Sequence, residues 1–299
     1  MGHHLRQPIT RLLTKQARIS VYPEMDAKHR VRRRVLLYDV CMTRTVLLCL
    51  HGWGGSKESF TELRAALKDA DLEILTPDLP GFGEEPEPER AWTTDQYADW
   101  VVGWFGQKWK VESGKWKTGG KVFLLGHSHG GRIAIKLAAR LNPAIRNPQS
   151  AISFPIDHLF LCAAAGIRHP RHFRRIIGLT LAKAGKILLS IPGLKLLQPL
   201  GKKFLYKLVR VHDYEKASPV MRQTLINVSA EDLTPLLSSI TVPTDIFWGR
   251  EDRMTPLGDG VLMHGRIRKS RLLVFEGRHG VHRERAVEIA EIIQRSMVL

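Results

Sequence analysis

The stretch from Lys121 to Gly131, K-V-F-L-L-G-H-S-H-G-G, constrains the fold of this chain more than any other. It opens with the short apolar run 122–125, whose length and Val and Phe content favour a buried strand over a helix. The sequence G-x-S-x-G follows at 126–130, and then apolar residues recur at helical spacing. A strand, a tight glycine-flanked turn and a helix are the context in which this motif exposes a reactive serine. An ordinary strand-to-helix turn is the alternative interpretation.

Ser128 occupies the centre of this turn, where the backbone is expected to be strained. Gly126 and Gly130 leave room for the close approach of the chain on either side. The helix that follows directs its free N–H groups and the positive end of its dipole towards the serine. The sequence therefore makes Ser128 a candidate nucleophile.

Three further segments, together with 126–131, resemble the α/β-hydrolase family, in the branch with a cap inserted after the sixth strand. They are H-G-W-G-G-S at 51–56, P-D-L-P-G-F-G at 77–83, and W-G-R-E-D at 248–252 with G-R-H at 277–279. The resemblance implies an α/β fold with a mostly parallel eight-stranded sheet, flanked by helices and carrying an inserted helical cap. One departure is Glu84, which stands where the family often has Ser; this changes surface polarity rather than chemistry.

The resemblance and the pattern of apolar runs divide the chain into three parts. Residues 1–165 are expected to form the first part of the core, with a basic arm at 1–18 that is a short helix or a loose segment. Residues 236–299 form the second part. Strands are expected at 19–22, 31–40, 45–50, 72–75, 122–125, 157–165, 242–248 and 270–275, most of them continuous apolar runs typical of a sheet with both faces covered.

Residues 166–235 are expected to form the cap. Leu and Ile alternate there with Lys and Arg at roughly helical spacing, and Pro192, Gly193 and Pro199 break the run into short amphipathic helices. Apolar faces of such helices would roof a hydrophobic pocket over Ser128, which favours a substrate with an apolar acyl or alkyl part.

A serine hydroxyl needs a base to take its proton, and an imidazole needs a carboxylate on its other nitrogen. In this fold the order is Ser, acid, His, each in a loop at the carboxyl end of a strand. The resemblance places the acid four residues after the Trp of Trp-Gly, which selects Asp252 over Glu251. His279 comes soon after the last strand, whereas His282 falls at the start of a helix. The predicted triad is Ser128, Asp252 and His279.

In the family, two backbone N–H groups stabilise the oxyanion; the matching residues are Trp53 and His129. The Trp53 ring lines the acyl pocket or packs in the core, and both options stay open. His51, His127 and His129 are explained by the loop glycines and the nucleophile turn, although they also invite a metal-site interpretation. No pair has helical ligand spacing with a third ligand nearby, so we expect neither metal nor cofactor.

The net charge of +17 is unevenly distributed. Residues 1–34 carry +7 and residues 166–222 carry +11, which leaves −1 for the rest of the chain. This charge is either a solvated exterior or a surface that attracts anionic substrates and, weakly, anionic membranes. The basic run at 32–34 has no nucleic-acid-binding module or aromatic platform beside it, so we expect no nucleic-acid partner. Oligomeric state stays open.

Cellular location is predicted from what the sequence lacks. No uninterrupted apolar stretch reaches the roughly 18 residues needed to span a bilayer, and the N-terminal residues have no secretory apolar core. Of the three cysteines, Cys49 and Cys162 lie in apolar strands and Cys41 makes the number odd, which indicates reduced thiols. These features predict a cytoplasmic protein.

The expected activity is the hydrolysis of carboxylic esters through an acyl-enzyme intermediate. Haloalkane dehalogenases and epoxide hydrolases of this fold use Asp where Ser128 stands, which excludes them. Carbon–carbon bond hydrolases, lipases, thioesterases and perhydrolases of the same fold remain alternatives. A ligand-binding or membrane-surface module that retains the fold is the non-enzymatic alternative.

Overall fold

The computed structural model describes residues 10–14, 17–25, 31–39, 45–108, 121–142, 154–169 and 217–298. Its centre is a parallel sheet of six strands in the order β5-β4-β6-β7-β8-β9. The strands in chain order are β4 (Thr45–Leu50), β5 (Leu72–Leu75), β6 (Val122–His127), β7 (His158–Cys162), β8 (Thr244–Gly249) and β9 (Ser270–Phe275). The α/β-hydrolase fold class expected from the sequence is confirmed.

Helices cover both faces of this sheet, which explains why its strands are continuous apolar runs. Along β4, Val46, Leu48 and Leu50 point into one core, while Leu47 and Cys49 point into the other. The first core is completed by α2 (Thr94–Lys108), α3 (His129–Arg140), α7 (Pro219–Ala230), the 3₁₀ turn η5 (Thr234–Ser239) and α8 (Leu257–Arg266). The second is completed by η1 (Lys57–Phe60), α1 (Thr61–Ala66), α9 (Val281–Glu284) and α10 (Ala286–Val298).

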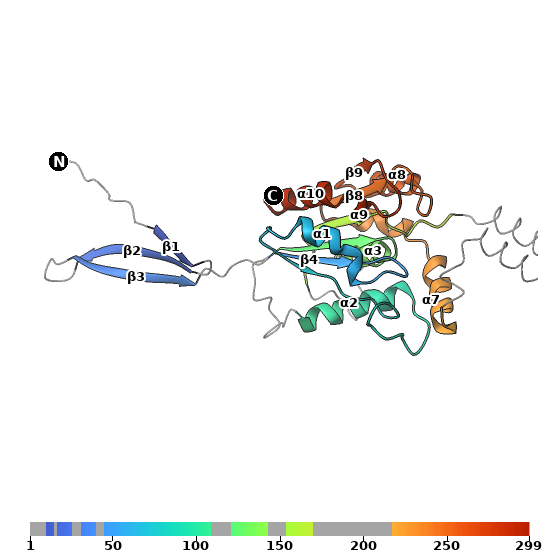
Figure 1. The fold of residues 1–299 in the computed structure, drawn as a ribbon, viewed down its shortest axis with the longest axis horizontal. Coiled ribbons are helices and arrows are strands. Elements are labelled where there is room, and N and C mark those ends of the chain that lie inside the picture. The colour runs from blue at the N-terminus through green and yellow to red at the C-terminus, as the bar shows by residue number, and fades with distance from the viewer. Residues whose placement is uncertain are drawn as a thin grey trace, which may run out of the picture.

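The described residues form a central sheet of six strands rather than the expected eight, because the expected strands at 19–22 and 31–40 lie in a second sheet. β2 (Ala17–Met25) and β3 (Val31–Asp39) form an antiparallel pair, and β1 (Thr10–Thr14) adds to β2. Among the described residues these three strands make a sheet of their own, as Figure 1 shows. The prediction of a helix or loose segment before residue 19 was therefore wrong for residues 10–14, because they pair antiparallel with residues 17–20, with an irregularity between Leu12 and Thr14.

The strand order reverses between β4 and β6. The chain passes from β4 outward to β5, crosses back to β6 on the other side of β4, and then proceeds towards β9. Loops that leave adjacent strands in opposite directions open a crevice at the carboxyl ends of the strands, where ligands bind in open α/β sheets. The loops after β4 and β6 begin at His51 and Ser128, so the two glycine-rich motifs meet at this crevice.

Both ends of the expected cap meet beside β7. The N–H of Leu233 donates to the carbonyl of Gly166 at 2.8 Å, so the chain leaves and re-enters the core at one point. The described part of this segment contains α7, which packs against the loop before α2. The Trp92 N–H in that loop donates to the Thr224 hydroxyl at 3.0 Å. Residues 170–216, where most of the cap helices and the membrane-contacting face were expected, lie outside the described residues.

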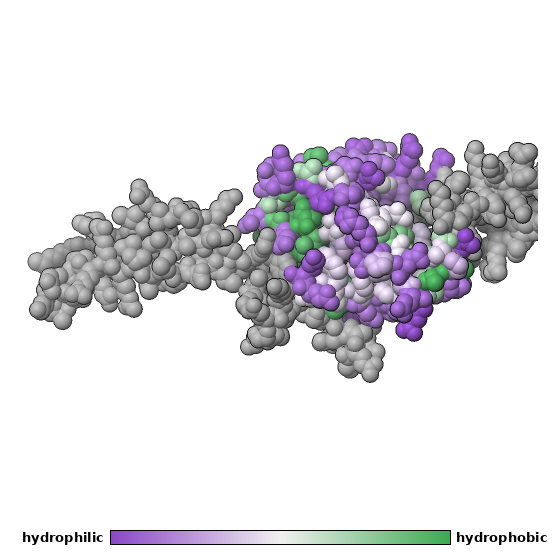
Figure 2. Space-filling model, turned by 60° about the horizontal axis from the view of Figure 1, so that its bottom comes forward, coloured by the Kyte–Doolittle hydropathy of each residue, from purple (hydrophilic) through white to green (hydrophobic). Residues whose placement is uncertain are grey.

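The described surface is mostly hydrophilic on the face seen in Figure 2, with small hydrophobic areas between polar ones. Large exposed apolar side chains in the described ranges are few: Ile226, Met254, Val261, Val287 and Val298. None of the helices within those ranges combines the length and the apolar character that a membrane span requires.

Candidate active site

Ser128 sits between β6 and α3 with φ 51° and ψ −111°, a conformation that non-glycine residues rarely adopt. A Cβ at Gly126 would lie 2.5 Å from the Gly130 carbonyl oxygen, and one at Gly130 would lie 2.0 Å from that of Leu50. Only glycine fits at these two positions, as the sequence predicted. The turn is also tied to the end of β7, because the Ser128 N–H donates to the Cys162 carbonyl at 3.2 Å.

The acid and the base of the predicted triad are in contact. Nδ1 of His279 lies 2.8 Å from Oδ2 of the buried Asp252, which makes the ring nitrogen the donor and leaves Nε2 free to accept a proton. Backbone N–H groups of Met254 and Thr255 donate to Oδ1 at 2.8 and 3.1 Å. Burial alone would raise the pKa of Asp252, but these donors and His279 outweigh it, so its pKa lies below the ordinary value.

Thr255 is a site residue that the sequence analysis missed. Its hydroxyl oxygen lies 2.8 Å from Oδ2 of Asp252, 3.2 Å from Nδ1 of His279 and 3.1 Å from the carbonyl oxygen of Ala163. Ala163, at the end of β7, has φ 44°, a further strained residue beside the site. Asp followed three residues later by Thr is a turn pattern that could have drawn attention to this residue.

The loop that carries His279 packs directly on the nucleophile turn. Nε2–H of His127 donates to the His279 carbonyl at 3.0 Å, and the two rings lie 4.8 Å apart between centroids. On its other side this loop touches the loop that carries Asp252, because the Glu251 N–H donates to the Gly277 carbonyl at 2.9 Å. A Cβ on Gly249 would lie 2.2 Å from the carbonyl oxygen of Arg278. The acid and base loops therefore contact each other backbone to backbone.

The two residues that compete for the roles of acid and base, Glu251 and His282, are placed less favourably. Glu251 is exposed, whereas Asp252 is buried behind the imidazole. His282 lies in the first turn of α9, at the start of a helix as predicted, but its ring is buried against Phe60 and its centroid lies 3.9 Å from that of the His127 ring. Burial first, and then the charge of Arg283, lower the pKa of His282 to about 4. The geometry thus favours Asp252 and His279, although their catalytic roles stay predictions.

The expected oxyanion residues lie on either side of the nucleophile turn. A Cβ on Gly52 would be 3.2 Å from that of Ser128, so the backbone leading into Trp53 passes close to the serine. His129 is the first residue of α3, and its N–H has no carbonyl one turn earlier in that helix. The Trp53 ring packs edge-on against Phe82 at 4.9 Å and His129 at 5.4 Å, and it borders the core.

Histidines near the turn have structural partners. Nε2 of His51 accepts the Leu79 N–H at 2.9 Å, so Nδ1 carries the proton and donates to the Gly52 carbonyl at 2.8 Å. The buried His129 ring lies 4.9 Å from that of Tyr97, and burial lowers its pKa to about 3. In the described ranges no group of three His, Cys, Asp or Glu side chains is arranged to hold a metal ion.

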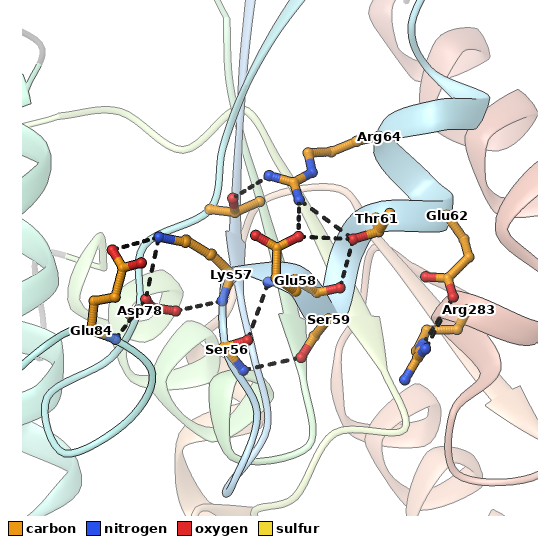
Figure 3. A network of polar contacts seen from close by, with 11 residues as sticks. Ser56, Lys57, Glu58, Ser59, Thr61, Glu62, Arg64, Asp78, Glu84 and Arg283 are labelled. Atoms are coloured by element: carbon orange, nitrogen blue, oxygen red, sulfur yellow. Dashed lines mark hydrogen bonds and ion pairs between the residues drawn. The ribbon is translucent and has the colours of Figure 1, made fainter.

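Asp78 fixes the start of η1, which continues the loop that holds Trp53, an expected oxyanion residue (Figure 3). Its carboxylate accepts the Lys57 N–H at 2.5 Å and the Glu84 N–H at 3.0 Å, and the Lys57 ammonium binds Glu84 at 2.6 Å. Burial opposes the charge on Asp78, but the two N–H groups outweigh it and hold its pKa below the ordinary value. The Ser56 hydroxyl accepts the Glu58 N–H at 3.3 Å and caps η1. The loop that holds Pro77 and Asp78 therefore supports the loop that holds Trp53.

The fold and these contacts define a hydrolase of the α/β type. The sequence model of the alpha/beta hydrolase family matches residues 47–292, and the chain belongs to this family.

Relatives agree with this class. The AB hydrolase superfamily protein YisY of Bacillus subtilis is 26% identical over 83% of this chain and 89% of its own length. A pimeloyl-[acyl-carrier protein] methyl ester esterase of Neisseria meningitidis is 25% identical over 76% of this chain and 68% of its own. The solved structure of an esterase from Exiguobacterium antarcticum has the same fold, with a TM-score of 0.58 over 95% of this chain and 96% of the esterase, at 22% identity. These comparisons support a hydrolase.

Proposed function

We propose that this protein is a serine hydrolase that cleaves carboxylic esters with an apolar acyl or alkyl part. The observation that carries the proposal is the 2.8 Å contact between His279 and the buried Asp252, on a loop that packs against the strained turn holding Ser128. A buried carboxylate that orients an imidazole is one half of the arrangement in which an imidazole activates a serine hydroxyl for attack on an acyl carbon, and the contact between His279 and Ser128 is itself part of the proposal. The relative named as a methyl ester esterase supports an ester as the substrate.

In the proposed reaction, the Ser128 oxygen attacks the ester carbonyl while Nε2 of His279 takes its proton. Negative charge develops on the carbonyl oxygen and is stabilised by the N–H groups of Trp53 and His129; one such donor typically contributes on the order of a hundredfold or more in rate. The imidazolium, stabilised by Asp252, then protonates the departing alkoxide. Water, deprotonated by His279, attacks the acyl-enzyme and releases the acid, which restores the serine.

Hydrolysis of 4-nitrophenyl butyrate by the purified full chain tests the proposal. We expect turnover that the S128A substitution reduces by roughly a thousandfold or more, because the remaining groups supply no nucleophile. The exposed Ser238 lies in η5, away from the turn, so S238A is the matched control and should retain activity. A fluorophosphonate probe should label the wild-type serine and leave S128A unlabelled.

Absence of both turnover and labelling above the S128A level would contradict the proposal and favour a non-enzymatic ligand-binding module. A series of 4-nitrophenyl esters from acetate to palmitate then measures the preferred acyl length. Preference for the shortest acetate over all longer esters would contradict an apolar acyl site.

A further inference from the structure

A cavity of about 390 Å³ opens beside His279. It is lined by both loops that carry the acid and the base, through Glu251, Arg253, Met254, Arg278 and His279. Its size lies within the range of small-molecule sites, which starts at about 300 Å³. Because His279, the proposed base, is part of its wall, a substrate whose ester lies at this residue can extend a second group into the cavity.

Two of the lining residues are arginines that directly adjoin the proposed triad in sequence: Arg253 follows Asp252 and Arg278 precedes His279. Both are exposed, and within the described ranges neither guanidinium has a carboxylate within 4.0 Å. The neighbouring Arg250 differs, because it binds Glu276 at 2.7 Å. The cavity therefore presents two cations whose charge the described side chains do not neutralise by direct pairing.

Hydrogen bonds within the protein hold the backbone of the two loops that carry Arg253 and Arg278. The Arg250 N–H donates to the Phe275 carbonyl at 2.8 Å, and the Glu251 N–H donates to that of Gly277 at 2.9 Å. Together with the bond between Asp252 and His279, these contacts hold the two loops at one spacing. Guanidinium groups on a backbone that is already held in place lose less conformational entropy on binding a planar anion than groups on a flexible loop do. This favours recognition of a carboxylate by charged hydrogen bonds.

We propose that Arg253 and Arg278 form an anion subsite, and that the substrates of the proposed esterase carry an ionised carboxylate in addition to the ester. This inference rests on the proposed function and specifies its substrate class. Met254, which is 65% exposed, provides an apolar wall for the chain that joins the two groups. Glu251 opposes an anion, so the three charged side chains of the lining, Glu251, Arg253 and Arg278, sum to one positive charge, and we expect the subsite to distinguish one carboxylate from none.

Matched pairs of esters test the proposal. Mono-4-nitrophenyl adipate and 4-nitrophenyl hexanoate have equal acyl length and differ in an ionised carboxylate at the end of the acyl chain. 4-(Butanoyloxy)benzoate and phenyl butanoate place that difference in the leaving group. We expect the anionic member of at least one pair to have the higher kcat/KM, by about tenfold at low salt after correction for uncatalysed hydrolysis, and this preference to shrink in 0.5 M NaCl.

Variants assign the preference to the subsite. R253Q and R278Q should each lower the anionic-to-neutral ratio of kcat/KM by about tenfold, whereas E251Q should raise it. The lysine variants R253K and R278K should restore part of the ratio. R266Q removes an exposed charge on α8 outside the cavity and should leave the ratio unchanged.

Equal ratios in the wild type and the R253Q/R278Q double variant would overturn the subsite and leave the esterase proposal standing. If the wild type hydrolyses none of the four esters, the esterase proposal fails on its own. Binding then decides the subsite: calorimetry should give a weaker affinity for monomethyl adipate when R253Q and R278Q are added to S128A, and an unchanged affinity would overturn it.

Discussion

Thr255 contacts both partners of the acid–base pair at the scale of single residues. Its hydroxyl has one proton to donate, and the shortest contact, 2.8 Å to Oδ2 of Asp252, makes this carboxylate its preferred acceptor. Oδ2 then receives two donors, one from Thr255 and one from His279. Because a carboxylate fixed by two side chains rotates less than one fixed by a single ring, we expect Thr255 to position the carboxylate of the proposed acid.

We expect Thr255→Val to lower kcat by roughly tenfold with little change in KM, because the loss of one hydrogen bond to a charged group typically corresponds to about 1.5 kcal/mol or more. Thr255→Ser keeps the hydroxyl and should recover most of kcat. Steady-state kinetics with 4-nitrophenyl butyrate measures both variants. A Val variant with wild-type kcat would contradict a positioning role, and equal losses in Val and Ser would indicate that the methyl group is what matters.

At the scale of elements, β8 and β9 act through the loops that follow them. These strands are hydrogen-bonded neighbours, and their loops meet where Gly249 ends β8. A methyl group on Gly249 would clash with two backbone carbonyls, those of Arg278 at 2.2 Å and Gly277 at 2.6 Å. Backbone oxygens cannot rotate away as a flexible side chain does, so the strands or the loops must separate.

Gly249→Ala should therefore lower kcat by more than tenfold and destabilise the protein by about 1–3 kcal/mol, the typical cost of overpacking. Gly265→Ala is the matched control: this residue lies in α8, nothing occupies the space within 4 Å of its added methyl, and alanine is the better helix former by roughly 0.5–1 kcal/mol. The free energy of unfolding in urea and kcat should both fall for Gly249→Ala. Gly265→Ala should retain activity with equal or higher stability. Identical behaviour of the two would contradict the backbone contact.

At the scale of the whole molecule, buried histidines couple stability to pH. His51, His127, His129 and His282 all have a pKa below the ordinary value, and burial is the largest cause in each case. The unfolded chain takes up protons at these rings near pH 6.5, whereas the folded chain does so only at lower pH. Stability is therefore intact above pH 6.5 and decreases as the pH falls from there towards the folded pKa values.

His282 alone, with a folded pKa of about 4, should contribute a loss on the order of 3 kcal/mol across this interval. Carboxyl groups with lowered pKa values, such as Asp245 and Asp252, add their own loss below about pH 4. Urea midpoints at pH 7.5, 6.5, 5.5 and 5 should fall for the wild type and fall less for His282→Phe. The exposed His264→Gln should follow the wild type. If the urea midpoints of the wild type and of His282→Phe fall equally with decreasing pH, the low pKa assigned to the buried His282 is wrong.

Much of the central fold could be predicted from the sequence, because a strand covered on both faces is an unbroken apolar run. The expected strands at 45–50, 72–75 and 270–275 have the observed bounds. The pairing of 10–14 with β2 could not be predicted, since T-R-L-L-T has no strong period and a strand's partner is a non-local property. The cap at 166–235 stays a prediction, supported where its two ends meet.

The candidate site was predictable where a motif fixes chain order, and less so where packing decides. Motif spacing selected Asp252 and His279, and the structure brings these two into contact. No motif pointed to the His127 ring beneath the His279 loop or to the unneutralised pair of arginines, because these depend on which loops the sheet brings together. Local patterns specify turns well, whereas the neighbours of a turn follow from strand order.

The bond between Gly166 and Leu233 has a consequence for how such proteins diversify. Since the intervening segment departs from and returns to a single place, its length and composition can change without altering the register of any described strand in the central sheet. If the segment forms the expected cap, mutations there would modify which molecules reach the candidate site, while the proposed catalytic groups keep their spacing. Substrate selectivity and the reactivity of the proposed catalytic groups can therefore evolve separately.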